Sequence, residues 1–117
     1  MSLTTNIYNY SITRSDTVLH QVTVESTDES AKDISGATVT YTVRANSKSG
    51  TQVIQKTVNN GIVLTTPLSG ILTVTLNPAD TALDVGRKYF YDCQVTLSGV
   101  VQTVQAGQIT VVGEVTS

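Results

Sequence analysis

The residues whose types best suit catalysis or metal binding are the single cysteine and the single histidine of the chain. Cys93 stands in the segment Tyr91-Asp92-Cys93, and a cysteine becomes nucleophilic when a cation or a helix N-terminus lowers its pKa. The alternating pattern places Cys93 on the apolar face with Tyr91 and Val95. Asp92 points to the opposite face, and an acid raises a thiol pKa. We therefore interpret Cys93 as a buried core residue.

His20 lies in "TVLHQVTVE" and shares a face with three valines of that segment. A Cys–His pair with Cys93 would need a third, orienting residue, and the sequence indicates none. A partly buried, hydrogen-bonded histidine is the interpretation we favour. One histidine and one cysteine also fall short of the usual ligand set of a zinc site.

Asp28, Glu29 and Asp33 form an acidic group that would suit calcium by charge. Their spacing does not match a dedicated calcium loop with its central glycine. The surrounding stretch "ESTDESAKD" is instead typical of a polar loop between strands. The sequence therefore predicts no metal site here.

Asp80, Asp84 and Asp92 lie close together in the sequence. Glycoside hydrolysis needs two such acids that converge on a cleft, but Asp80 is already explained by helix capping. The chain also lacks a P-loop and a dinucleotide fingerprint. We expect no catalytic, cofactor-binding or metal-binding residues, no cofactor, and no enzymatic activity.

Four tyrosines bear on carbohydrate recognition. Tyr8 and Tyr10 share one face of the first strand and would form a small aromatic platform. Tyr89 and Tyr91 are expected inside, with their hydroxyls at the edge of the core. The chain has no tryptophan, the aromatic residue that such platforms often use.

Composition sets the wider limits. A length of 117 residues predicts a single domain over 1–117, and a hydrophobic fraction of 39% suits a globular protein. Seven basic and nine acidic residues give a net charge of −2. The basic residues are scattered, which argues against a nucleic-acid partner. Apolar runs are short, so we expect no membrane span, and no signal peptide is visible at the start. One cysteine allows no intrachain disulfide and leaves the redox compartment open.

The elements that position these residues are β-strands. Thr and Val dominate, and apolar residues recur with period two, as in "ATVTYTVRA", "ILTVTL" and "YFYDCQVTL". This pattern predicts an all-β antiparallel sandwich of about seven to eight strands. The predicted strands lie near 7–14, 17–25, 37–45, 52–58, 62–66, 70–76, 87–97 and 100–112.

Turn chemistry separates the strands. Asn59-Asn60-Gly61 can supply the positive φ angles of a tight hairpin, and Ser98-Gly99 predicts a two-residue hairpin between the last two strands. One short helical turn is expected near 78–83. Asn77 suits its N-cap and Pro78 its first position, while Asp80 stands where a capping-box acid belongs.

The segment "ADTALDVGRKYFYDC" resembles the end of the penultimate strand of an immunoglobulin variable domain. Tyr91 stands two residues before Cys93, as in the tyrosine corner of that fold. The chain has no partner cysteine and no core tryptophan, and extra residues separate Ala82 from the tyrosines. We therefore expect an immunoglobulin-like (Ig-like) topology without antibody-type ancestry.

Most of the chain resembles small phage and prophage β-sandwich modules, a group that includes the N-terminal domain of baseplate upper proteins. The matching segments, in order, are "YSITRSDTVLHQVTV", "KDISGATVTYTVR", "SGILTVTLNPADTALDVGRKYFYDCQVT" and "VQTVQAGQITVVGEVT". Shared features are an Arg-x-Asp, a turn at Asp33-Ile34-Ser35-Gly36 and a Tyr-x-Tyr-Asp. The resemblance implies assembly parts and carries no catalytic residue with it.

These observations lead to one expected function and one alternative. The expected function is a non-enzymatic virion or assembly protein of a bacteriophage or prophage, made in the bacterial cytoplasm. It would dock on the tail, baseplate or neck, binding other virion proteins or itself as a homo-oligomer. The alternative is a module that binds a host-surface receptor or a carbohydrate. A small enzyme built on Cys93, His20 and a carboxylate is the third hypothesis. The uncharged closing segment 100–112 is expected either to pair inside the sheet or to offer an edge to a partner.

Overall fold

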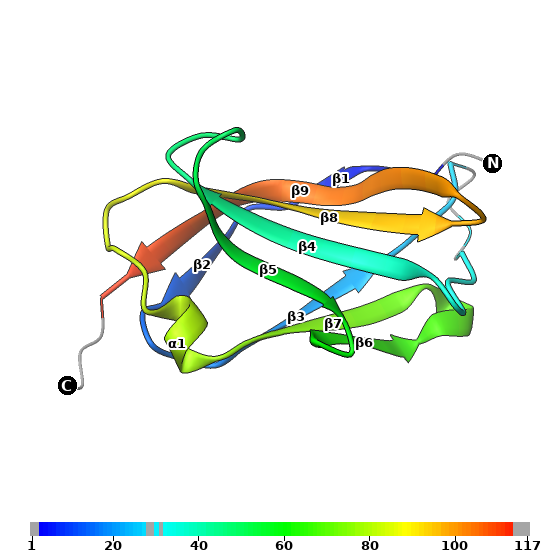
Figure 1. Ribbon diagram of the computed structural model, residues 1–117, viewed down its shortest axis with the longest axis horizontal. Helices are drawn as coiled ribbons and strands as arrows, with labels where there is room; N and C mark the ends of the chain where they lie inside the picture. The colour runs from blue at the N-terminus through cyan, green and yellow to red at the C-terminus, as the bar shows by residue number, and fades with distance from the viewer. Residues whose placement is uncertain (1–2, 28–29, 31, 114–117) are drawn as a thin grey trace.

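The computed structural model describes residues 3–27, 30 and 32–113 and shows an all-β structure (Figure 1). Its strands are β1 (Asn6–Ile7), β2 (Tyr10–Thr13), β3 (Val18–Thr23), β4 (Thr38–Ala45), β5 (Gln52–Val58), β6 (Gly61–Thr66), β7 (Ile71–Leu76), β8 (Tyr89–Leu97) and β9 (Val100–Val112). Two short helices, the 3-10 helix η1 (Pro67–Ser69) and α1 (Pro78–Thr81), flank β7. The predicted strands are therefore confirmed, except that the first is split into β1 and β2.

The strands form one hydrogen-bonded sheet in the order β1-β9-β8-β4-β5-β6-β7-β3, and β2 also pairs with β9. The sheet curls, so that β3, β6 and β7 lie across from β4, β8 and β9 (Figure 1). The prediction of purely antiparallel pairing is wrong. Both β1 and β2 run parallel to β9, and β5 meets β6 in parallel over two residue pairs.

The core follows the predicted alternation. In β4, β7 and β8 the residues predicted to face inward are buried, except for the partly buried Leu97 at the end of β8. The buried apolar set is Ile12, Val22, Val24, Ile34, Ala37, Val39, Tyr41, Val43, Ala45, Ile54, Ile62, Leu72, Val74, Leu76, Tyr89, Tyr91, Cys93, Val95, Val104, Ile109 and Val111. Hydrophobic burial between the facing parts of the sheet thus drives the curl.

A β-bulge in β9 changes which of its residues face the core. The pairing of β8 with β9 shifts register between Cys93 and Gln94, because β9 carries one extra residue at this point. As a result the successive residues Val104 and Gln105 are both buried. The bulge therefore brings a polar amide, Gln105, to the inner side of the sheet.

The predicted hairpin at Ser98 and Gly99 is confirmed: these residues have φ values of 51° and 79° and join the antiparallel strands β8 and β9. Asn59 and Gly61 also have positive φ values, 70° and 96°, but β5 and β6 pair in parallel, so the prediction of a tight hairpin there is wrong. The first helical turn of α1 carries the capping box of Asn77 and Asp80, in which the Asp80 carboxylate accepts the Asn77 backbone N–H at 2.8 Å. The helix ends at Thr81, earlier than predicted.

The tyrosine hydroxyl that contacts the backbone just before β8 belongs to Tyr89, not to Tyr91, which the sequence matches to a tyrosine corner. Tyr89, the first residue of β8, accepts the backbone N–H of Asp84 on its hydroxyl at 2.9 Å. The Tyr91 hydroxyl donates instead to the carbonyl oxygen of Tyr8 at 2.6 Å. Tyr89 therefore ties the segment that follows α1 to the core.

Between β1 and β2 the backbone of residues 8 and 9 passes very close to the backbone of β9. Tyr8 donates its N–H to the carbonyl oxygen of Ala106, and Gln108 donates its N–H to Asn9 Oδ1 at 2.8 Å. A Cβ at Gly107 would lie 2.1 Å from the Tyr8 carbonyl oxygen. Glycine is therefore required where the first strand passes across β9.

We expect Gly107→Ala to lower the free energy of unfolding by about 1–3 kcal/mol, because the added methyl group must displace backbone atoms. Chemical denaturation measures the loss. Gly113→Ala is the matched control, since a Cβ at Gly113 meets no atom within 4 Å. Equal stability of the two variants would contradict the close approach.

Candidate functional site

An aromatic cluster lies between the open edges of β1–β2 and β3. Its rings come from Tyr8, Tyr10, His20, Tyr41 and Tyr91. The closest pair is Tyr10 and His20, whose ring centroids are 4.6 Å apart, and Tyr8 stacks on Tyr10 at 5.7 Å. The predicted pair of Tyr8 and Tyr10 on one face is thus present, but packed against a buried histidine.

Hydrogen bonds join the hydroxyls of this cluster. The Tyr10 and Tyr41 hydroxyl oxygens are 2.5 Å apart, and Tyr41 also lies 3.1 Å from His20 Nδ1. The Tyr91 hydroxyl, whose one proton goes to the Tyr8 carbonyl oxygen, also lies 2.9 Å from Gln105 Oε1. Burial raises the pKa of Tyr10 to about 12, so its hydroxyl keeps its proton at neutral pH. Most of this cluster is therefore a satisfied polar network of the core, as a buried hydroxyl requires.

Within the described residues, His20 is the member of the cluster that has a buried side-chain nitrogen without a hydrogen bond. Its side chain is 6% exposed, and its buried Nε2 has no hydrogen-bond partner among the described residues. Burial lowers the pKa of His20, because the charged imidazolium would lose its hydration. The burial of His20 agrees with the sequence interpretation, but only its Nδ1 is hydrogen-bonded in the described part of the chain.

Cys93 lies in the core, as predicted, and is fully buried. Burial, and then the nearby Asp92 carboxylate, raise the pKa of the Cys93 thiol to about 12. The thiol therefore stays protonated at neutral pH, which is opposite to the activation that a nucleophilic cysteine needs.

The acidic residues considered for chemistry have separate roles. Asp80 caps α1 and forms an ion pair with Lys56 at 2.8 Å, while Asp84 pairs with Arg87 at 3.2 Å on the surface. Asp92 lies on the outer face of the sheet. The structure thus does not bring these three acids onto one cleft.

Asp33 accepts the N–H and the hydroxyl of Ser35 in a tight turn, and these hydrogen bonds lower its pKa. Asp28 and Glu29 lie outside the described residues. Within the described ranges, no group of three His, Cys, Asp or Glu side chains is placed to hold a metal ion.

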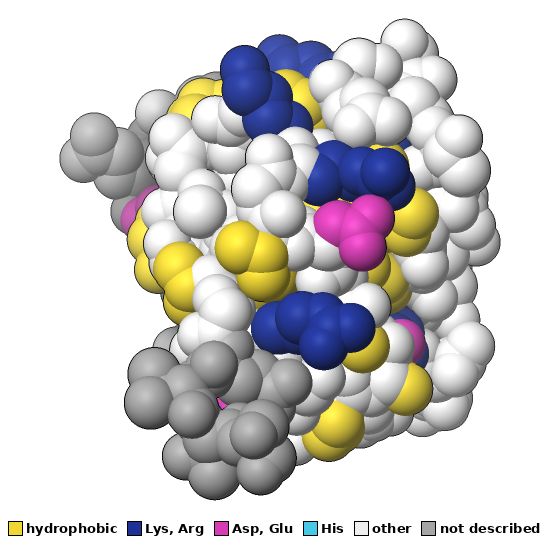
Figure 2. Space-filling model, turned by 90° about the vertical axis from the view of Figure 1, so that its left-hand side faces the viewer, with side chains coloured by type: hydrophobic (Ala, Val, Ile, Leu, Met, Phe, Trp, Pro, Cys, Tyr) yellow, Lys and Arg dark blue, Asp and Glu magenta, His cyan; other side chains and the backbone are white. Residues whose placement is uncertain are grey.

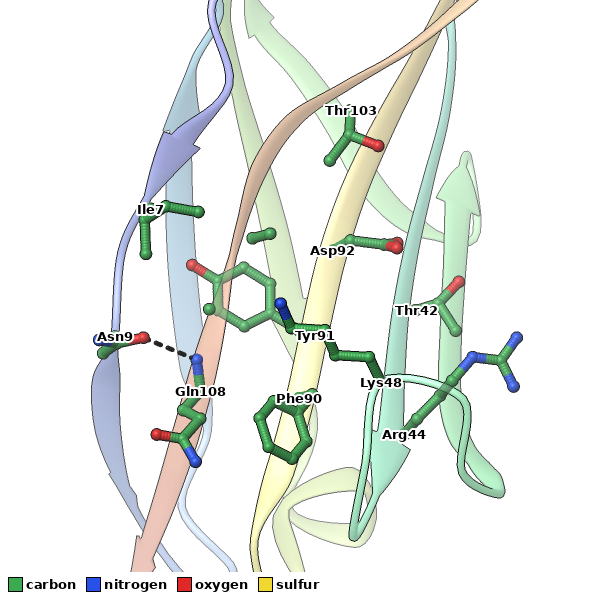
Figure 3. Close-up of a pocket in the computed structure, with 12 residues that line it drawn as sticks. Ile7, Asn9, Thr42, Arg44, Lys48, Phe90, Tyr91, Asp92, Thr103 and Gln108 are labelled. Carbon is green, nitrogen blue, oxygen red and sulfur yellow. Dashed lines mark hydrogen bonds between the residues drawn. The ribbon is translucent and has the colours of Figure 1, made fainter.

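A hollow of about 280 Å³ opens on the outer face of β4, β8 and β9 (Figure 3). Its lining residues are Ile7, Asn9, Thr42, Arg44, Lys48, Phe90, Tyr91, Asp92, Thr103, Ala106, Gly107 and Gln108. The register explains the hollow. Asp92 lies between Thr42 and Ala106 on the neighbouring strands, and Phe90 lies between Arg44 and Gln108. The small Ala106 side chain of β9 leaves space beside the larger side chains of β8.

The charged residues that line this hollow differ in their burial and in their hydrogen bonds. Asp92 is half-buried, and the loss of hydration raises the pKa of its carboxyl group, while the charge of Arg44 acts in the opposite direction. Arg44 Nη1 donates to the Gly50 carbonyl oxygen at 3.1 Å, so it supports the loop that carries Lys48. Lys48 extends from that loop across the front of β8 (Figure 3). The hollow thus combines an acid, two cations and an aromatic ring.

Further cations lie at the end of the molecule where β8 begins. The Asn46 backbone N–H donates to the Lys88 carbonyl oxygen at 2.7 Å, which joins the β4–β5 loop to the segment before β8. On the face shown in Figure 2, Lys and Arg side chains form separate groups with neutral and hydrophobic side chains between them.

Strand β3 is one of the two ends of the sheet, and it carries no lysine, arginine or acid. Strand β3 ends the strand order and, within the described part of the chain, pairs only with β7. Its sequence VLHQVT has no lysine, acid or proline. Leu19 projects outward and is 71% exposed. By contrast, the uncharged β9 pairs with β8 on one side and with β1 and β2 on the other. Segment 100–112 is therefore paired within the sheet along most of its length, on both sides at residues 105, 106 and 109 and on one side elsewhere.

Sequence reasoning placed Phe90 and Asp92 on the outer face but did not identify the hollow. The signal available was an outward-facing aromatic residue beside an outward-facing acid. The space beside them depends on the small Ala106, whose alignment with β8 follows from the bulge. The spacing of residues within one segment does not determine the register between β8 and β9.

Comparisons with known proteins yield no matching family model, and a search of curated proteins yields no match. The described helices are too short to cross a membrane. The functional assignment therefore depends on the residues and geometry given above.

We expect Cys93 to resist thiol reagents in the folded protein and to react rapidly after denaturation. Cys93→Ser should lower the free energy of unfolding by about 1–3 kcal/mol, because a hydroxyl would replace a sulfur atom packed in the core. Labelling followed by mass spectrometry and denaturant titration measure the two effects. Fast labelling under native conditions would contradict the buried position.

A second prediction concerns pH. Because the pKa of His20 is lowered on folding, the unfolded state binds more protons than the folded state below about pH 6.5. The free energy of unfolding should therefore fall as the pH decreases from that value toward the folded-state pKa, and the contribution of His20 should then level off. Denaturant titrations over about pH 5 to pH 7 measure this slope. His20→Gln should reduce the slope, and an unchanged slope in that variant would refute the assignment.

Proposed function

We propose that this chain is an Ig-like β-sandwich module that works as a non-enzymatic assembly part of a bacteriophage or prophage virion. The strand order supports the Ig-like description. One part of the curled sheet contains β1, β2, β9, β8, β4 and β5, and the part across from it contains β6, β7 and β3. The α1 turn and the Tyr89 contact lie in the connection between β7 and β8, where Ig-like domains have their tyrosine corner.

The single observation that carries an assembly role is the edge of β3. Exposed strand edges offer unpaired N–H and C=O groups to other chains, and proteins usually block them with lysine, proline or a bulge. Strand β3 has none of these and pairs with β7 in regular register over six residue pairs. Its exposed Leu19 adds apolar area to that edge.

A second copy of the chain is the partner that this edge suits best. Two identical, regular edges can pair antiparallel about a two-fold axis, which closes the interface. Leu19 would then be covered by its symmetry mate, and the backbone groups of both edges would be satisfied. In a virion, the same edge-to-edge contact would join two copies of the module into a closed dimer.

The test is a charge placed on the edge. The wild-type protein should increase in mean mass over a concentration series in light scattering, and Leu19→Lys should remain a monomer, because a charged side chain disfavours edge pairing. Thr75→Lys is the matched control, since Thr75 lies opposite Leu19 on the interior strand β7. It should fold and associate as the wild type does.

The proposal would fail on two results together. These are a strictly monomeric wild-type protein and the absence of the protein from purified virions examined by mass spectrometry. Equal loss of association in Leu19→Lys and Thr75→Lys would show that the sheet face, not the β3 edge, forms the contact.

A further inference from the structure

The outer-face hollow suggests a second activity, on the opposite side of the sheet from the core. We propose that the hollow formed by Phe90, Asp92, Lys48, Asn9 and Gln108 binds one saccharide ring. This inference goes beyond the assembly role, because neither β3 nor its edge contributes to the hollow.

The size of the hollow suits a single ring. At about 280 Å³ the hollow lies just below the about 300–1,000 Å³ of most small-molecule pockets, so its ligand must be small, about one ring. Ala106 and Gly107 line the hollow, and the small Ala106 side chain leaves room there. The positions of these residues are held by the crossing of Tyr8 and Asn9 over β9. The hollow is therefore preformed by the fold.

The lining chemistry suits a molecule with an apolar face and polar edges. Phe90 lies at one end of the hollow and offers an aromatic surface for the C–H groups of a sugar ring (Figure 3). The Asp92 carboxylate accepts hydrogen bonds from hydroxyls, and the amide groups of Asn9 and Gln108 both donate and accept. Lys48 adds donors from the far loop. Hydroxyl groups of a sugar can satisfy all of these partners, because each hydroxyl is both donor and acceptor.

The mixed charge favours a polyol over an ion. Asp92 opposes the cations Arg44 and Lys48 within the same hollow, and Arg44 is already engaged with the Gly50 carbonyl oxygen. A carboxylate or phosphate ligand would meet the half-buried Asp92, which is unfavourable for a second negative charge. A neutral ligand avoids this cost and gives the Asp92 oxygens hydrogen-bond donors.

The hollow is distinct from the tyrosine pair expected from the sequence. Tyr10 has its hydroxyl joined to Tyr41, and the Tyr8 ring stacks on Tyr10 beside His20. A separate hollow lies there, lined by Tyr8, Tyr10, Val18, Leu19, His20, Gln21 and Gln105. Substitutions can therefore distinguish the two aromatic sites.

Saturation-transfer NMR on the full chain tests the proposal with glucose, galactose and N-acetylglucosamine, each offered separately, and with N-acetylglycinate as a carboxylate probe. At least one sugar should show transfer to its ring C–H protons. Phe90→Leu keeps an apolar side chain but removes the ring, and it should abolish this signal. Asp92→Ala should raise the Kd of that sugar about tenfold, the ratio expected for loss of a hydrogen bond to a charged group.

Tyr8→Leu is the matched control and should leave the signal unchanged. Loss of the signal in Tyr8→Leu but not in Phe90→Leu would place the sugar at the tyrosine pair and overturn the proposal. Transfer to N-acetylglycinate alone would assign the hollow to a peptide carboxylate instead. If none of the three sugars shows transfer, the proposal of a saccharide site is also overturned. Light scattering of Phe90→Leu should still show wild-type association, so failure of this site is separable from failure of the β3 contact.

Discussion

The pairing of β4 with β8 is the constraint on which the rest of the structure depends. The two strands remain in register over eight residue pairs, from Thr38 opposite Thr96 to Ala45 opposite Tyr89. Because side chains alternate across a strand, this one ladder determines both faces of the sheet. On the inner face it sets Tyr41 and Tyr91 close enough to stack, with ring centroids 5.3 Å apart. On the outer face it aligns the Arg44 and Phe90 pair beside Asp92.

The inner face shows how a core accommodates polar atoms. Tyrosine supplies a large apolar ring, but a buried hydroxyl without a partner is costly. Tyr41 meets this requirement through Tyr10 and His20, and Tyr91 meets it through the Tyr8 carbonyl and Gln105. These bonds link strands from both parts of the curled sheet. The network therefore fixes how β1, β2 and β3 sit relative to β8.

The outer surface separates two kinds of feature. The edge of β3 is regular, uncharged and open, and it suits contact with another protein chain. The hollow over β8 and β9 is concave and carries mixed charge, and it suits a small polar ligand. An assembly module with a preformed ligand site would use its edge for attachment and leave the β8–β9 face exposed. The two proposed activities are therefore compatible on one chain.

The sequence by itself determined the strands, the turns and the division between core and surface. Alternation of Thr with Val predicts strands wherever one face is buried, and local residues such as Asn77 with Asp80, or Ser98 with Gly99, specify their own turn geometry. The burial of Cys93 and His20 followed from the faces that they share with valines and a tyrosine. Each of these features depends on residues within one segment, so the sequence of that segment is enough to predict it.

Only the tertiary structure decided which strands are neighbours and what gathers between them. The parallel pairing of β1 and β2 with β9, the bulge that turns Gln105 inward and the open edge of β3 all depend on contacts between residues far apart in the sequence. Two strands with the same alternation can pair in several registers, and the choice is made by the packing of the whole core. The hollow beside Asp92 exists because that choice sets the small Ala106 opposite Asp92, among the larger side chains of β8.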